Sequence, residues 1–255
     1  MSATPAPPTL ELRGVTKSFG QVHALRGVDF EVRAGEVMAL VGDNGAGKST
    51  LIKCIAGIYS IDSGQILFDG EPVSISGPKD AAKLGIEVVY QDLALCDNLD
   101  VVQNMFLGRE DHDALYRLRE APMEQRTTET LASLSVTTIR SVRQLVATLS
   151  GGQRQSVAVA RAVLWNNNVV FLDEPTAALG VAQTRQVLDL VKRLGEQGLA
   201  VVLVSHNLSD VFEVADRITV LRLGSNVGVY EKSATDEQAI VQAITFGEQA
   251  AEATG

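Results

Sequence analysis

A glycine-rich octapeptide in the first fifth of the chain most strongly limits how the chain can fold. Residues 42–49 read GDNGAGKS and fit the pattern G-x-x-x-x-G-K-[ST], directly after the strand-like run 36–41. Glycines let the backbone turn tightly, so that successive N–H groups face one set of phosphate oxygens, and the following helix presents its positive end to the same anion. The pattern predicts a strand, a phosphate-binding loop and a helix in succession, and binding of a nucleoside triphosphate.

Two residues at the end of this loop have specific expected roles toward the triphosphate. Lys48 is expected to reach the β- and γ-phosphates, and the Ser49 hydroxyl to bind the Mg²⁺ that bridges them. The predicted nucleotide-binding residues here are Gly42, Asp43, Asn44, Gly45, Ala46, Gly47, Lys48, Ser49 and Thr50. Apolar residues follow at positions 51, 54, 55 and 58, as on the buried face of a helix, which argues against an ordinary surface turn.

Composition limits the class of protein. Hydrophobic residues make up 45% of the 255 positions, enough for a buried core. A formal net charge of −9 argues against a nucleic-acid-binding surface, which needs clustered Lys and Arg. No apolar run approaches the roughly 18 residues of a membrane helix, and the N-terminus lacks the features of a secretion signal. We expect a cytoplasmic protein with a disordered lead-in over residues 1–9.

Hydrophobic patterning divides the chain into a β-rich start, a helical middle and an alternating end. Predicted strands are 10–15, 28–32, 37–41, 64–68, 87–90, 169–172, 200–204 and 217–223. After the helix of the phosphate loop, helical spacing is found around 101–107 and 127–134, and further helices are predicted at 153–164, 183–194, 208–215 and 235–245. The pattern predicts an α/β fold over residues 10–246: a phosphate-loop core with a mixed sheet, an N-terminal antiparallel β subdomain and a helical subdomain inserted over about residues 92–160. A loose tail is expected over residues 247–255.

Two adjacent carboxylates end the predicted strand 169–172. Parallel sheets bind ligands at the carboxyl ends of their strands, which places Asp173 and Glu174 where a ligand is expected. Asp173 is suited to hold Mg²⁺ through a water, and Glu174 to polarise the attacking water as a general base. Acidic residues also often begin surface loops, so this motif gains weight only beside the phosphate loop.

A second anion cradle precedes that strand. Leu149, Ser150, Gly151, Gly152 and Gln153 open another predicted helix with a glycine turn at its N-terminal end. A chain that holds one γ-phosphate has no evident use for two cradles, unless the second serves a neighbouring molecule.

Together these motifs resemble the ATP-binding cassette (ABC) family of ATPases, across nearly the whole chain from about residue 10 to 229. The run LSGGQ at 149–153 matches the signature of that family. The resemblance implies that Gln91 is the Q-loop glutamine that reaches Mg²⁺ or the attacking water, that His206 contacts the γ-phosphate, and that Phe19 stacks on adenine. Taken alone, these would read as a polar strand end, a loop histidine and a sheet-packing aromatic residue. The implied catalytic residues are Lys48, Gln91, Glu174 and His206.

The resemblance also implies a head-to-tail dimer. In such dimers Ser150, Gly151 and Gly152, with Gln153 beside them, clamp the γ-phosphate bound by the partner's Lys48 and Ser49. One position departs from the family pattern: Gly180 stands where the family usually has an aspartate. This leaves communication across the dimer open.

Two short runs look like the ATPases of monosaccharide importers for ribose, xylose or fructose: AALGV at 177–181 and GDNG at 42–45. The likeness implies an ATP- and Mg²⁺-dependent subunit at the cytoplasmic face of the inner (plasma) membrane. Its implied partners are a second copy of the chain, integral-membrane permease subunits and, indirectly, a periplasmic sugar-binding protein, with no nucleic acid. The alternative is a soluble ABC ATPase that acts on a macromolecular complex. A small-molecule kinase would not account for residues 149–153.

Overall fold

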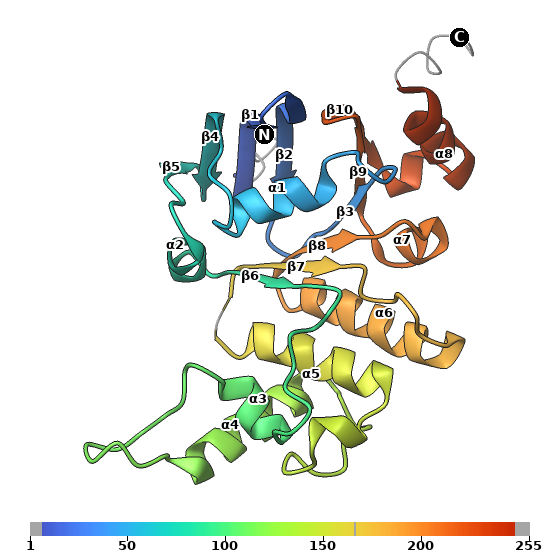
Figure 1. Ribbon diagram of the computed structural model, residues 1–255. Coiled ribbons are helices and arrows are strands. Elements are labelled where there is room, and N and C mark those ends of the chain that lie inside the picture. Colours follow the sequence, from blue (N-terminus) through green and yellow to red (C-terminus); the bar gives the residue numbers. More distant parts are fainter. Residues whose placement is uncertain (1–6, 166, 248–255) are drawn as a thin grey trace, which may run out of the picture.

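The computed structural model describes residues 7–165 and 167–247, whose strands form two sheets (Figure 1). Residues 1–6 of the predicted lead-in and 248–255 of the predicted tail lie outside the described residues. The first sheet is antiparallel, in the order β2-β1-β4-β5, and the second has the order β10-β9-β3-β8-β7-β6. The first sheet consists of β1 (Leu10–Phe19), β2 (Val22–Val32), β4 (Ser63–Phe68) and β5 (Glu71–Val73). The second consists of β3 (Val37–Val41), β6 (Ile86–Val89), β7 (Val169–Asp173), β8 (Ala200–Val204), β9 (Arg217–Arg222) and β10 (Ser225–Glu231).

The second sheet is mixed, and helices cover it. Strands β3, β6, β7, β8 and β9 run parallel, and β10 pairs antiparallel with β9 at one edge. The α-helices are α1 (Lys48–Ile55), α2 (Pro78–Lys83), α3 (Val101–Phe106), α4 (Glu120–Ser133), α5 (Gly151–Val163), α6 (Val181–Glu196), α7 (Leu208–Val214) and α8 (Glu237–Phe246). Short 3₁₀ turns lie at Val146–Thr148 and Lys232–Ala234. None of the helices in the described part of the chain combines the length and apolarity that a bilayer crossing needs.

Both faces of the mixed sheet are buried, which is why its inner strands are continuous apolar runs. On β3, Met38 and Leu40 belong to a core shared with α1 and the antiparallel sheet. The alternate residues Val37, Ala39 and Val41 belong to a second core, shared with α6 and with the helices α3 to α5. Helix α1 and its preceding loop therefore lie packed between the mixed sheet and the antiparallel sheet.

The chain between β6 and β7 is helical where it is regular, as the sequence predicts for this span. Helices α3, α4 and α5 lie together at the lower end of Figure 1, coloured green to yellow. Helix α5 packs against α3 and α4 and also against α6. It is thus the element that joins the helical part of the molecule to the sheet core.

Four elements differ from the sequence expectation. Strands β1 and β2 are longer than predicted, because their ladder shifts register near Gly14 and Gly27, both at positive φ, and the shifts interrupt the polar–apolar alternation. Helix α2 has only six residues, too few for a periodic signal. Strand β10 was missed because Gly228 and polar residues break its pattern.

An ion network around Arg217 joins the two sheets. Its guanidinium lies 2.9 Å from Glu31 on β2, 3.1 Å from Glu36 and 3.4 Å from Glu231 on β10. The side chains of Arg217 and Glu36 are only 12% and 9% exposed. Burial raises the pKa of Glu36, and Arg217 and Arg33 oppose this rise.

Replacing Arg217 with Ala is expected to lower the free energy of unfolding by about 3 kcal/mol, because Glu36 would stay buried without its main cationic partner. The raised pKa of Glu36 sets the sign of the pH dependence: the uncompensated carboxylate is costly above its folded pKa and harmless once protonated. The deficit of Arg217→Ala should therefore shrink as the pH falls toward the ordinary glutamate value of 4.5. Urea unfolding at pH 8 and pH 5 measures this, with the exposed Arg13→Ala as control. A deficit equal at both pH values would contradict it.

Candidate nucleotide-binding site

The loop between β3 and α1 is pressed between neighbouring strands at two glycines. Gly42 has φ 149°, and a Cβ there would overlap the carbonyl oxygen of Leu221. Gly47 has φ 107°, and a Cβ there would lie 2.8 Å from the carbonyl oxygen of Ala24. A side chain at either position would displace the loop, so the glycine pattern reflects close backbone approach as well as backbone freedom.

Lys48, the first residue of α1, folds back over this loop. Its Nζ donates to the carbonyl oxygens of Gly42 at 2.5 Å and Asp43 at 3.1 Å. Burial lowers the pKa of Lys48, and the negative charges of Glu174, Asp173 and Asp43 act against that effect. A bound phosphate would offer this half-buried ammonium group a full negative charge in place of two carbonyl dipoles.

One cleft of about 470 Å³ brings together the residues predicted for catalysis. They reach it from the β3–α1 loop and from the carboxyl ends of the neighbouring strands β6, β7 and β8. The predicted residues that line it are Gly42, Asp43, Asn44, Lys48, Ser49, Gln91, Asp173, Glu174 and His206. The remaining lining residues are Val41, Ser205, Leu208 and Ile244. Ile244 comes from α8, which the sequence did not connect with the site.

Asp173 and Glu174 have different environments at the end of β7. Burial, and then the charge of Glu174, raise the pKa of Asp173, while Lys48 and Lys53 lower it. Glu174 has φ 50°, a left-handed conformation that costs a residue with a side chain about 1–2 kcal/mol. Its backbone N–H donates to the carbonyl oxygen of Val204 at 2.9 Å, which ties the end of β7 to the end of β8.

His206 follows β8 and contacts Glu174 directly. Its Nδ1 lies 2.8 Å from Oε2 of Glu174. The Glu174 side chain is 16% exposed and that of His206 is 74% exposed, so the carboxylate sits inside the cleft and the imidazole at its rim. The two residues are 32 positions apart in the sequence, and no local pattern predicts their contact.

The second glycine turn lies elsewhere, at the start of α5. Ser150 is the N-cap of α5: its Oγ accepts from the N–H of Gln153 at 3.4 Å, and its own N–H donates to Oε1 of Gln153 at 2.9 Å. Nε2 of Gln153 donates to the carbonyl oxygen of Thr138 at 2.6 Å. The Gln153 amide is thus engaged within its own chain at both ends. Ser150, Gly151, Gly152 and Gln153 are absent from the lining of the cleft at Lys48.

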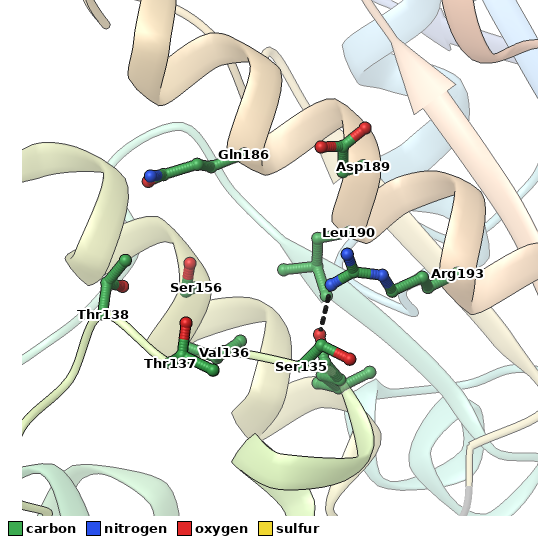
Figure 2. Close-up of a pocket in the computed structure, with 10 residues that line it drawn as sticks. Ser135, Val136, Thr137, Thr138, Ser156, Gln186, Asp189, Leu190 and Arg193 are labelled. Atoms are coloured by element: carbon green, nitrogen blue, oxygen red, sulfur yellow. Dashed lines mark hydrogen bonds between the residues drawn. The ribbon is translucent and has the colours of Figure 1, made fainter.

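A small hollow of about 120 Å³ lies between α6, residues 134–138 and Ser156 of α5 (Figure 2). Arg193 on α6 crosses its edge and donates to the carbonyl oxygen of Leu134 at 3.0 Å. None of the residues predicted for nucleotide binding lines it. It marks the joint between α6 and the helical part of the molecule.

Comparison with known protein families matches residues 25–177 to the family described as ABC transporter. The chain belongs to the ABC transporter family. It is the ATP-binding cassette of that family, an ATPase, and both the family and the fold class predicted from the sequence are confirmed.

Relatives and solved structures match this cassette over most of its length. A fructose import ATP-binding protein of Rhizobium meliloti is 47% identical over 87% of this chain and 88% of its own. A xylose/arabinose import ATP-binding protein of Sulfolobus acidocaldarius is 46% identical over 92% of this chain and 93% of its own. A nucleotide-free ATP-binding cassette from an ABC transporter has a TM-score of 0.80 at 23% identity, covering 98% of this chain and all (100%) of that one. A dimeric bacterial ABC transporter cassette has a TM-score of 0.72 at 25% identity, covering 88% of this chain and 98% of that one.

The aromatic residue expected to stack on adenine lies at the end of β1 in this cassette. The Phe19 side chain is exposed, and its ring meets that of Tyr59 edge-on at 5.0 Å between centroids. A second hollow, of about 450 Å³, is lined by Val22, which lies three residues after Phe19, and by His23 and residues 43–50, among others. Thr50 and Gly45 to Gly47 contribute to this second hollow and not to the cleft. No local pattern predicts a role for Tyr59, because its contact with Phe19 joins positions 40 apart.

Gly180 of the cassette ends the loop that follows Glu174 and is the N-cap of α6. Its N–H donates to Oε1 of Gln183 at 3.0 Å. Gln183 also lies against Gly152, where an added Cβ would be 3.1 Å from the Gln183 Cβ. Leu179, in the loop after Glu174, lies against Gly151 of the same turn, where an added Cβ would be 3.0 Å from Cδ2 of Leu179. The loop therefore contacts the glycine turn of α5 within the same chain.

Proposed function

We propose that this cassette hydrolyses ATP to drive a membrane importer for a monosaccharide, either a pentose or a hexose. The observation that carries the ATPase part is the single cleft that collects Lys48, Glu174 and His206 from three segments of the chain. The sugar part is supported by the two relatives at 46% and 47% identity, whose names describe import of fructose and of xylose or arabinose. These names give no support to the alternative, a soluble ATPase that acts on a macromolecular complex.

Hydrolysis requires a positioned water and a proton acceptor beside the γ-phosphate. The N–H groups of the glycine loop and Lys48 bind the phosphates. The attacking water forms a bond to the γ-phosphorus while the bond to the oxygen shared with the β-phosphate breaks, and Glu174 accepts the proton of the water. His206 orients the Glu174 carboxylate, and its exposed ring has room to turn toward a γ-phosphate. Gln91 lines the same cleft and is placed to hold the water.

The oxygen donors of the cleft fit Mg²⁺. Ser49 offers a hydroxyl, Asp173 a carboxylate and Gln91 an amide oxygen, all hard ligands of the kind that this ion prefers. No group of three or more His, Cys, Asp or Glu side chains within residues 7–165 and 167–247 could hold a metal ion. Ser49, Asp173 and Gln91 would hold Mg²⁺ together with phosphate oxygens. The ion would neutralise charge that develops on the triphosphate.

The glycine turn at Ser150 is proposed to complete the site of a second copy. It is an anion cradle whose residues do not line the cleft at Lys48 of the same chain, and a dimeric relative of the same fold has been solved. In this arrangement each triphosphate lies between the loop of one chain and Ser150 of the partner subunit. The homodimer would dock under permease subunits at the cytoplasmic face of the plasma membrane, with a periplasmic sugar-binding protein that delivers the solute.

Sugar uptake by cells that carry the chain tests the import proposal. Deleting the gene is expected to abolish uptake of at least one radiolabelled sugar among ribose, xylose, arabinose and fructose, and the intact gene should restore it. A Lys48→Ala gene, which encodes a chain with a weakened triphosphate site, should not restore it. Uptake of all four sugars at the parental rate after deletion would contradict the proposal.

A further inference from the structure

A partly buried hydrogen bond ties together the two segments that carry Glu174 and His206. The Thr176 hydroxyl donates to Oδ2 of Asp210 at 2.6 Å, across 34 positions of sequence. Thr176 lies two residues after Glu174, and Asp210 lies in the first turn of α7, four residues after His206. Asp210 is only 6% exposed, although a carboxylate is costly to bury without a good partner.

This bond is one of three connections between the same two segments. The first is the backbone bond from Glu174 to Val204, and the second is the contact of 2.8 Å between His206 and Glu174. The bond from Thr176 to Asp210 is the third. The Thr176–Asp210 bond is a side-chain hydrogen bond from residues 175–179 to another segment. The other hydrogen bonds of residues 175–179 are backbone bonds within the local turns.

Glu174 needs such support because its backbone is strained. Its φ is 50°, and Ala178 in the same loop has φ 60°. Residues keep such conformations only where the surroundings hold them. On the other side, the N-terminus of α7 is fixed by the Asn207 side chain, which accepts from the N–H of Ser209 at 3.1 Å. Asp210 therefore holds the loop of Glu174 against a capped helix end.

We propose that Asp210 is a positioning residue for ATP hydrolysis: through Thr176 it holds the carboxylate of Glu174 at the distance from His206 at which Glu174 can accept the proton of the attacking water. A general base oriented by other side chains is a common arrangement in catalysis. This inference rests on the catalytic role proposed above for Glu174. Asp210 itself lies outside the lining of the cleft.

The test compares kcat and KM for ATP in the purified full chain. Thr176→Val keeps the shape of the side chain but removes the donor, and is expected to lower kcat about 10- to 100-fold, because small misplacements of a catalytic group are costly. KM should change less than about threefold, since Thr176 does not bind substrate. Thr176→Ser restores the hydroxyl and should recover most of kcat. Thr128→Val, at an exposed position of α4, is the matched control.

Asp210→Asn and the double variant complete the test. Asp210→Asn keeps the shape but weakens the acceptor, so kcat should fall severalfold at constant KM. The variant Thr176→Val/Asp210→Asn should be no worse than about twofold below Thr176→Val, because both changes remove one interaction. If Thr176→Val does not fold, Asp210→Asn decides alone: a fall in kcat at constant KM supports the proposal.

The proposal is overturned if a folded Thr176→Val chain has the wild-type kcat. If Thr176→Val does not fold, the proposal is overturned by a wild-type kcat in Asp210→Asn. Glu174→Gln is measured beside them. If Glu174→Gln hydrolyses ATP at more than a tenth of the wild-type rate, the role proposed for Glu174 is wrong. If Glu174→Gln is inactive and Thr176→Val is normal, only the positioning role of Asp210 is wrong.

Discussion

Replacing Glu174 with Gln is expected to lower the rate of ATP hydrolysis about 10²- to 10⁴-fold, the range that a positioned general base contributes. The amide keeps the size of the side chain and can still bond to His206, but it cannot accept the proton of the attacking water. Nucleotide binding should persist because Lys48 and the glycine loop are unchanged. ATP should therefore convert the variant from monomer to a long-lived dimer.

Steady-state phosphate release and sedimentation with and without ATP measure both parts of this prediction. Glu237→Gln, in the first turn of α8, is a suitable control because it removes a carboxylate away from the cleft. Hydrolysis by Glu174→Gln at more than a tenth of the wild-type rate would remove Glu174 from the role of base.

Replacing Ser150 with Asp is expected to abolish ATP-dependent dimer formation and hydrolysis together. Asp is as good an N-cap as Ser, so α5 should keep its start, whereas the new negative charge would face the triphosphate of the partner subunit. ATP should still bind to the loop of the same chain, with a dissociation constant within about threefold of wild type, because Ser150 does not line that cleft.

Ser150→Ala separates the two effects of this position. It removes the cap, at a cost of about 1 kcal/mol in stability, but adds no charge. Its hydrolysis should fall less than that of Ser150→Asp, although its stability falls more. Wild-type hydrolysis in Ser150→Asp, or loss of nucleotide binding by the single chain, would contradict the head-to-tail arrangement.

The sequence predicts the parts of the site that local rules govern. The glycine loop is set by backbone freedom and close approach at Gly42 and Gly47, and the position of Asp173 and Glu174 follows from the end of a parallel strand. Such features are encoded within a few residues. The fold class follows from the same alternation of strands and helices.

The parts that the sequence does not predict are contacts between distant segments. Tyr59 against Phe19, Glu174 against His206 and Thr176 against Asp210 all depend on how the sheet places loop ends beside one another. The lengths of β1 and β2 were underestimated for a local reason, the register shifts near Gly14 and Gly27.

The role of Gly180 in the dimer depends on groups outside this chain. Within the chain it starts α6 and brings Gln183 against Gly152. Leu179, in the loop after Glu174, contacts the same glycine turn at Gly151.

The most direct measurement is a structure of the Glu174→Gln chain with ATP and Mg²⁺. We predict two chains arranged head to tail, each triphosphate bound by Lys48 of one chain and by the N-terminal turn of α5, at Ser150, of the partner subunit. A monomer, or a dimer in which every contact to the triphosphate comes from one chain, would contradict the proposed function at its centre.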